Sequence, residues 1–333
     1  MRFFIFITVC LLSLSSFAQN QIAVLNHNGE ISTHYGANAL REAYNKAEDG
    51  DVITLSAGTF NAVDIKKLIT IRGAGMGIRT TDTETIEEPT ILTGIFNVTA
   101  DDNESNHFIL EGVECSSRIA LRGIRGSQFI KCHFSEINFE ANYGLLENCT
   151  FIHCVSEKFN SMYTMNNTTL SGVNCVFRNA VFTGDSNLLT LTNCIIELMD
   201  CFVHDAFDCA SLQNCICISP NAQKFTTQTN IYYTLWAGPH SGDTPFTNLS
   251  DNSHNNYVVA STDNLFKDGT FYQLTDEAKA TYLGSDGKEI GIYGGNIPFT
   301  PQLTTAQITR FDVSPRTTAD GKLSIDIEIQ ANE

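Results

Sequence analysis

Histidine and acidic residues cluster between Asp200 and Asp208, where the chain reads DCFVHDAFD. His204 lies beside Asp205 there, a pair that could act as a general base with an orienting carboxylate. The acidic side chains would instead form a calcium site if they met on one exposed face. Strand alternation, however, would place Val203 and Asp205 on one side and His204 on the other, so the acids need not converge. The sequence leaves these alternatives open.

Cysteine is the second residue type with reactive potential, since the chain has 11 cysteines and all but Cys10 follow the N-terminal segment. The even number that remains would indicate disulfides in a secreted chain. Five of them, however, recur at the fourth position of a repeated six-residue frame, where a free cysteine packs as a small apolar residue. They are Cys132, Cys149, Cys175, Cys194 and Cys215. We therefore expect a stack of buried, reduced thiols.

Two cysteines outside this row, Cys201 and Cys209, could pair with each other. The state of this pair stays open. Zinc is not indicated, because the sequence has no Cys-x-x-Cys pair.

The six-residue frame repeats along the middle of the chain with starts 19, 17, 26, 19 and 21 residues apart, a period that indicates a solenoid. The frames are LEGVEC from Leu110, FIKCHF from Phe129, LENCTF from Leu146, GVNCVF from Gly172, LTNCII from Leu191 and LQNCIC from Leu212. An earlier frame, IRGAGM from Ile71, starts 39 residues before Leu110, a gap that predicts two coils with Ile91 to Val98 in the one between.

The third frame position is where each coil is expected to bend. It is occupied by Asn148, Asn174, Asn193 and Asn214, with Gly73 and Gly112 upstream. Asn and Gly tolerate a left-handed backbone better than other residues. Stacked coils should then align the Asn amides into a hydrogen-bonded ladder. Lys131 interrupts the row, so we expect this ladder to begin at Asn148.

These frames resemble the repeats of the pectate lyase-like superfamily, which includes pectate lyases, polygalacturonases and alginate or chondroitin lyases. The resemblance implies an all-β fold, a single-stranded right-handed parallel β-helix. The amphipathic segment from Asn38 to Glu48 would cover its N-terminal end, and GSDGKEIGIYGG from Gly284 would form the closing coil. These motifs specify the fold far more than the chemistry.

The C-terminal residues have a different pattern, in which Leu323 to Ile329 alternate with polar residues. Asp320-Gly321 would supply a turn to a partner strand between Ile308 and Val313. We therefore predict a signal peptide over 1–18, a β-helix over 19–296, and a strand pair over 297–333 that packs on the solenoid.

Lyases of the superfamily abstract a proton beside a carboxylate with a basic residue, while calcium or another cation neutralises the acid. The resemblance therefore directs attention to the basic run of Arg118, Arg122, Arg125 and Lys131. Arg122 would point outward, near Glu140 on the next coil. A solvated ion pair explains these two residues as well. The Gly-His-Gly and Arg-Ile-Lys motifs of polygalacturonases and the Asp array of pectate lyases are absent, so catalysis stays open.

Aromatic residues in the polar stretch 221–264 offer another possible site. Tyr232, Tyr233 and Trp236 could stack on a sugar ring, but we favour a role in closing this stretch onto the solenoid.

The N-terminus predicts the compartment. Arg2, the apolar run from Phe3 to Leu14 and the small residues around Ala18 are typical of a signal peptide cleaved after Ala18. A lipoprotein anchored through Cys10 is disfavoured, because Val9 stands where a small residue is needed. We expect a secreted, periplasmic or cell-surface monomer with no transmembrane segment.

The net charge of −17 disfavours nucleic acid as a partner. Acidic polysaccharide would need a calcium bridge or a local basic groove. The functional hypothesis is a protein that binds or processes extracellular carbohydrate. The alternatives are a polysaccharide lyase or hydrolase, and a noncatalytic surface, adhesion or spacer protein.

Overall fold

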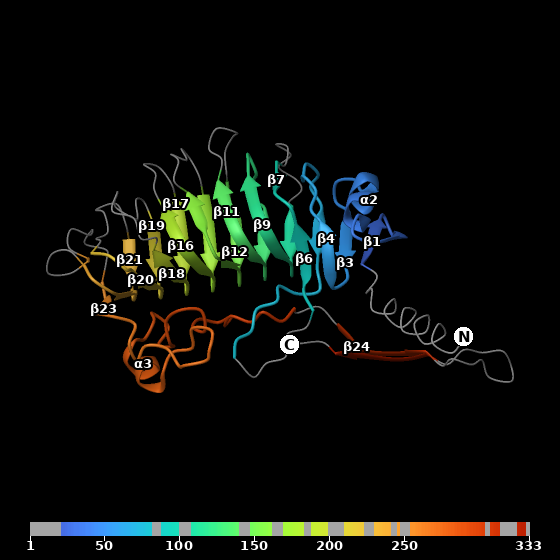
Figure 1. The fold of residues 1–333 in the computed structure, drawn as a ribbon. Coiled ribbons are helices and arrows are strands. Elements are labelled where there is room, and N and C mark those ends of the chain that lie inside the picture. Colours follow the sequence, from blue (N-terminus) through green and yellow to red (C-terminus); the bar gives the residue numbers. More distant parts are fainter. Residues whose placement is uncertain are drawn as a thin grey trace, which may run out of the picture.

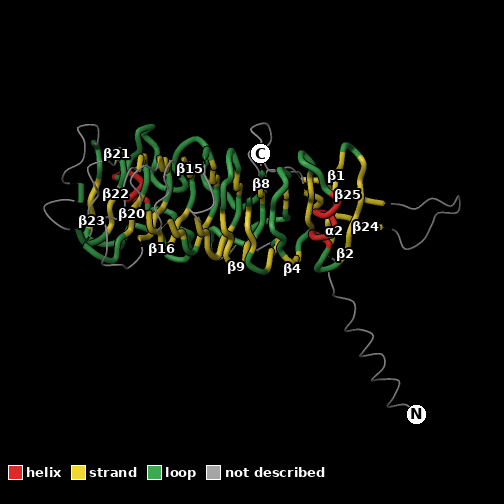
Figure 2. The backbone as a smooth tube through the Cα atoms, turned by 90° about the horizontal axis from the view of Figure 1, so that it is seen from above, coloured by secondary structure: helices red, strands yellow, loops and turns green. Residues whose placement is uncertain are grey.

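The computed structural model describes residues 21–81, 88–99, 108–139, 147–161, 169–182, 188–198, 210–222, 230–240, 245–246, 254–303, 307–313 and 325–330. They form a parallel β-solenoid of about seven turns (Figure 1), which confirms the predicted fold class. Seen from above, the coils follow one another along a single axis (Figure 2).

One face of the solenoid is an 11-stranded sheet, called sheet A here. Its strands are β2 (Glu30–Tyr35), β1 (Ile22–His27), β3 (Val52–Leu55), β5 (Thr70–Arg72), β8 (Ile109–Glu111), β10 (Gln128–Ile130), β12 (Cys149–Ile152), β15 (Thr169–Val173), β17 (Leu188–Thr192), β19 (Ala210–Gln213) and β21 (Asn230–Tyr232). From β3 onward the neighbours are parallel, as successive coils require.

A second, 12-stranded sheet, called sheet B, completes the coils. Its strands are β4 (Gly58–Asn61), β6 (Thr90–Thr93), β7 (Phe96–Val98), β9 (Glu114–Leu121), β11 (His133–Phe139), β13 (Val155–Ser156), β14 (Phe159–Ser161), β16 (Val176–Phe182), β18 (Ile195–Leu198), β20 (Ile216–Ile218), β22 (Leu235–Ala237) and β23 (Tyr257–Val259).

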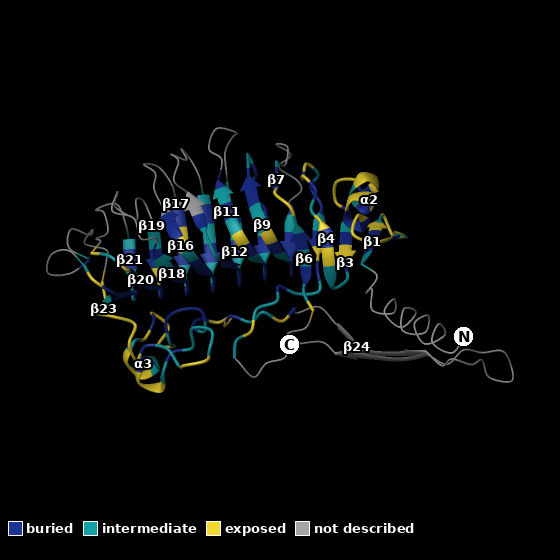
Figure 3. Cartoon of the chain, in the orientation of Figure 1, coloured by how far each residue is buried: buried dark blue, intermediate teal, exposed yellow. Residues whose placement is uncertain are grey.

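The inner core is built from in-register aromatic and aliphatic residues. Phe129 and Phe151 occupy the same position on neighbouring coils, and their rings stack with centroids 4.7 Å apart. Phe134 packs edge-on against both rings. Each buried ring stabilises the fold by about 2 kcal/mol. Figure 3 shows this core as the dark blue strands, with exposed residues on α2 and α3.

The N-terminal end is closed by a hairpin and a helix. Asn28 and Gly29, with φ of 50° and 89°, form the two-residue turn between β1 and β2. Asn-Gly between alternating segments is the strongest short hairpin signal, and our sequence analysis missed it. Helix α2 (Ala39–Lys46) buries Ala39, Leu40 and Ala43, which confirms the predicted cap.

The register of the coils differs from the sequence-based alignment at one frame. Phe129 pairs with Phe151, so the frame after FIKCHF is FIHCVS, and it begins at Phe151 rather than Leu146. His153 therefore occupies the bend position, with a φ of 52°. Asn148 is an exposed residue that precedes β12, and Cys149 pairs with Leu170. Their placement in the two ladders was wrong.

The prediction of two coils between the frames at Ile71 and Leu110 was also wrong, because these frames lie on neighbouring coils. β5 pairs directly with β8, so sheet A has no strand between them, and β6 and β7 belong to sheet B. The residues that follow β5 leave the coils instead, and Met76 is buried against the C-terminal segment.

A second hydrophobic core lies outside the coils. The outer side of sheet B contributes Val155, Val176, Ile195, Ile216 and Leu235, and the C-terminal segment contributes Leu265, Leu274, Ile290, Ile292 and Phe299. This segment includes α3 (Asp276–Thr281) and runs back beneath the coils (Figure 1). From β13 to β22, sheet B is therefore packed on both sides.

The predicted C-terminal strand pair is present. β24 (Gln307–Val313) and β25 (Ile325–Gln330) pair antiparallel, with Val313 opposite Ile325. They form a sheet separate from A and B. The proposed Asp320-Gly321 turn lies outside the described residues, and packing of the pair on the solenoid stays a prediction.

Candidate functional site

The predicted catalytic residues are only partly within the described chain. Glu140, His204 and Asp205 lie outside it, as do Cys201 and Cys209. Arg122 is half-buried, and its backbone N–H donates to Val98 O at 2.9 Å, directly after β9. The Arg122–Glu140 pair stays a prediction.

The bend positions form a continuous polar row beneath a segment that we call the strap, residues 284–303. Lys131 Nζ donates to Gln302 O, and His153 Nε2 lies 3.0 Å from Ile297 O. Asn214 Oδ1 accepts from the Ser285 N–H at 2.9 Å. The strap thus contacts the row on successive coils. Lys131 belongs to this row and does not interrupt it, contrary to the sequence-based expectation.

The Asn side chains serve the strap rather than one another. Asn174 Nδ2 donates to Ile292 O at 2.7 Å and to Gly294 O at 3.0 Å. The expected amide-to-amide ladder is therefore wrong at Asn174, although the left-handed bend is confirmed at Asn174, Asn193 and Asn214. Gly73 is not left-handed; a Cβ there would lie 2.3 Å from Gly112 O.

The thiol row is present with one exchange, because Cys154 replaces Cys149. Its members are Cys132, Cys154, Cys175, Cys194 and Cys215, all buried and free. Cys115, Cys149 and Cys217 are also buried and free. Burial raises the pKa of the Cys149 thiol to about 12. The Cys149 thiol is therefore protonated at neutral pH and behaves as a core residue.

A charged cluster joins sheet B to the C-terminal segment. Arg178 donates to both carboxylate oxygens of Glu157, at 2.8 and 2.9 Å, and to Tyr272 Oη at 2.9 Å. The Tyr272 hydroxyl donates to Glu197. The hydrogen bond from His133 and the Arg178 guanidinium lower the pKa of Glu157 to about 2. A carboxylate with this pKa is a poor proton acceptor at neutral pH, so the cluster is a structural clamp.

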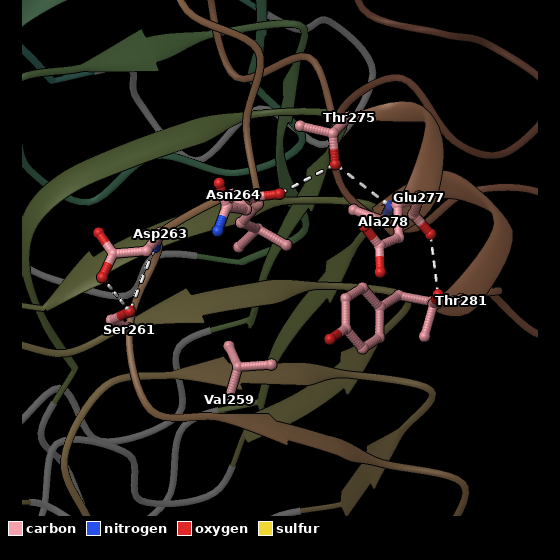
Figure 4. Close-up of a pocket in the computed structure, with 10 residues that line it drawn as sticks. Val259, Ser261, Asp263, Asn264, Thr275, Glu277, Ala278 and Thr281 are labelled. Atoms are coloured by element: carbon pink, nitrogen blue, oxygen red, sulfur yellow. Dashed lines mark hydrogen bonds between the residues drawn. The ribbon is translucent and has the colours of Figure 1, made fainter.

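A pocket of about 460 Å³ lies beside α3, at the C-terminal end of the solenoid. In Figure 4 its labelled walls carry Asp263 with Ser261 on one side and Glu277 with Thr281 on the other. Asp263 Oδ2 accepts from Ser261 Oγ at 2.8 Å. These hydroxyl and carboxylate groups suit hydrogen bonds to an uncharged polyol, and the two carboxylates would repel an acidic one.

The outer side of sheet A carries two columns of uncharged side chains. The first column is Gln128, Thr150, Ser171, Thr190, Ser211 and Asn230. The second is Ile130, Ile152, Val173, Thr192, Gln213 and Tyr232. We call these two columns the neutral face. All of these residues are half-buried or exposed, since their neighbours along each strand point inward.

The neutral face is held in register by the coils themselves. Neighbouring parallel strands stand about 4.8 Å apart, so each column repeats at that step. Ser171 Oγ donates to Thr150 Oγ1 at 3.0 Å within the first column. On the N-terminal side of the neutral face, the second column continues with charged residues, Glu111 on β8 and Arg72 on β5, which form an ion pair.

The aromatic residues of the 221–264 stretch have separate positions. Trp236 is 1% exposed, and its Nε1 donates to Gly238 O at 3.2 Å, so this ring is a core residue. Tyr232 ends the second column of the neutral face, and its ring meets His254 edge-on at 5.1 Å.

The described residues contain no helix long and apolar enough to cross a bilayer. They also contain no cluster of three or more His, Cys, Asp or Glu residues that could hold a metal ion. No protein-family model matches the chain, and no curated protein matches it. The described coils show the parallel β-solenoid; membership of the pectate lyase-like superfamily remains a resemblance.

Proposed function

We propose that this protein is a secreted β-helix protein that binds neutral carbohydrate without cleaving it, with the neutral face as its binding surface. The observation that carries this proposal is the absence of charge in both columns from β10 to β21, in a chain with a net charge of −17. Charge is placed elsewhere on the surface.

The chemistry of the face fits a ligand rich in hydroxyl groups. Ser and Thr hydroxyls and the Gln128 amide both donate and accept hydrogen bonds. The Gln213 amide also belongs to the face, and its Nε2 donates to Ser285 Oγ of the strap at 2.8 Å. An uncharged ligand that covers them removes no ionic group from water, which would be costly. The aliphatic residues of the second column could contact the apolar side of a sugar ring.

The regular step favours an extended polymer over a single sugar. A chain lying along the solenoid axis would meet an equivalent pair of side chains on every coil. Because the backbone already fixes these side chains in register, binding orders little of the protein. Many weak, repeated contacts then add up along the ligand.

Two further features support carbohydrate as the ligand. Tyr232 gives the second column an aromatic end, and such a ring presents both an apolar side and a hydroxyl. The pocket beside α3 could hold a neighbouring sugar unit.

Binding without catalysis is supported by the clamp on sheet B. Glu157 and Arg178 are engaged with each other and with Tyr272, and so are unavailable as base and cation. Lyase chemistry through Arg122 and Glu140 is the alternative, and calcium would belong to that alternative.

The test is a binding panel of neutral and acidic polysaccharides, with and without calcium. We expect retention on neutral polymers that changes little with calcium or salt, because no ionic contact is involved. Binding only to acidic polymers in the presence of calcium would contradict the proposal. Unsaturated product from an acidic polymer, lost in Arg122→Ala, would support the lyase.

A rigid spacer is the second candidate, favoured by the strap and the two cores, which tie the coils into one continuous unit. It predicts no retention on any polymer of the panel.

A further inference from the structure

β2 is the terminal strand of sheet A, and one of its edges faces away from the solenoid. β1 and β2 are joined by the two-residue Asn28-Gly29 turn, so His27 and Glu30 form a hydrogen-bonded pair. At the other end of the two strands, the Gly36 N–H donates to Gln21 O at 2.8 Å, so Gln21 and Gly36 are also a hydrogen-bonded pair. In an antiparallel pair of strands, hydrogen-bonded pairs alternate with non-hydrogen-bonded pairs, whose backbone groups point away from the partner strand. The backbone N–H and C=O groups of Ile31, Thr33 and Tyr35 therefore point to the open edge.

The side chains of these residues are unusual for an open edge. Ile31 is 63% exposed and Tyr35 is 64% exposed, and both lie on the same side of the strand as Thr33. The opposite side is occupied, since His34 is buried and its Nδ1 lies 3.3 Å from Glu42 of α2. Edge strands are normally protected by lysine, proline or a bulge. The strand EISTHY has neither residue, and its register with β1 is unbroken.

We propose that β2 is a self-association site, on which the β2 strand of a second copy pairs antiparallel about a two-fold axis through Thr33. Ile31 of each copy then lies opposite Tyr35 of the other, and the two Thr33 residues face each other. All outward N–H and C=O groups of the three residues obtain partners. Sheet A becomes continuous across the two molecules.

A second copy fits this edge because the strand is self-complementary. An isologous contact covers the Ile31 and Tyr35 side chains of both copies at once, as an aliphatic–aromatic cross-strand pair. Glu30 is the only acidic residue of the strand, and in this register it lies opposite Gly36, so no two carboxylates meet. The net charge of −17 on each molecule still repels the other at long range. Added salt should therefore strengthen the dimer.

This site does not depend on the carbohydrate proposal, and it predicts a dimer where the sequence analysis expects a monomer. The experiment is sedimentation equilibrium of the full chain over a range of concentrations. We expect a monomer–dimer equilibrium whose dissociation constant falls as salt rises. Ile31→Lys and Thr33→Pro should raise it at least tenfold, because one places charge in the contact and the other removes an edge N–H that β1 does not use.

Ile95→Lys is the matched control, since Ile95 is 64% exposed and lies between β6 and β7. This variant should dimerise like wild type, and circular dichroism checks that all variants fold. Hydrogen exchange of the β2 amides distinguishes pairing with a second copy from coverage of the edge by another segment of the same chain. The amides of Ile31, Thr33 and Tyr35 should be protected only at concentrations where the dimer forms. A monomer at every concentration, a dimer insensitive to both edge variants, or protection of these amides in the dilute monomer would overturn the proposal.

Discussion

At the scale of single residues, the bends show how the surroundings decide a backbone conformation. Lys131, His153 and Tyr233 adopt φ near 50°, as the Asn residues of the same row do. This conformation costs about 1 kcal/mol or more in a residue other than Gly or Asn. The bend is nevertheless required on every coil, and contacts with the strap stabilise Lys131 and His153 in it.

Asn174→Ala tests the value of these contacts. The substitution leaves the carbonyls of Ile292 and Gly294 without their buried donor, and it should lower the free energy of unfolding by about 1 to 3 kcal/mol beyond the cost of the bend itself. Asn148→Ala is the control, because Asn148 has a similar φ of 54° but is exposed. Denaturant melts of the two variants give the difference. Equal losses would show that the strap contacts contribute nothing.

The thiols yield a second prediction at this scale. All eight cysteines among the described residues are free and buried, so alkylation of the native protein should label none of these eight. Alkylation after unfolding without reductant should label all eight, and mass spectrometry locates the labels. A disulfide between any two of these eight residues would contradict the structure of the core.

At the scale of elements, the strap is the part that the sequence could not reveal. Its contacts with the bend row join residues such as Asn174 and Ile292, which lie 118 positions apart, and the strap has no repeat. The coils were predictable because one local frame recurs. Their alignment failed at one frame, since Asn148-Cys149 imitates the Asn-Cys pair of the others while His153-Cys154 does not. The uneven spacings of 17 and 26 residues were the available signal.

The strap should respond to pH through His153. Burial lowers the pKa of His153 below its ordinary value of 6.5, and the nearby Lys131 ammonium lowers it further, whereas the hydrogen bond to Ile297 O raises it. The Phe299 ring also contacts this imidazole. A depressed pKa means that the unfolded chain binds the proton first. The stabilisation is therefore present above about pH 6.5 and is lost as pH falls through the lower pKa of the folded protein.

The variant that tests this is His153→Asn, which installs the residue used on the next coils. Hydrogen exchange across residues 292–299 should accelerate in wild type as pH falls below 6.5, after correction for intrinsic rates. The variant should show a smaller acceleration. An identical pH response in the two proteins would remove His153 as its source.

At the scale of the whole molecule, the two sheets have different surroundings. From β13 to β22 the outer side of sheet B is covered by the C-terminal segment and clamped by Arg178, whereas sheet A presents the neutral face. The misplaced frame concealed this face in the sequence. It put Glu147 at the second frame position, where the correct register places Ile152. With that one shift, the first residue before each frame and the second residue within it would have shown two uncharged columns from the Phe129 frame onward.

The most direct test of the account is one acidic substitution at the centre of the neutral face. Thr190→Glu places a carboxylate at an exposed position of the first column. Ser135→Glu is the control, because it places a carboxylate at an exposed position of sheet B, outside the neutral face. Co-sedimentation with the neutral polysaccharide that binds wild type most tightly measures both. The account predicts that Thr190→Glu weakens binding at least tenfold while Ser135→Glu binds like wild type. Equal binding by the two variants, or no binding of wild type to any neutral polymer, would contradict it.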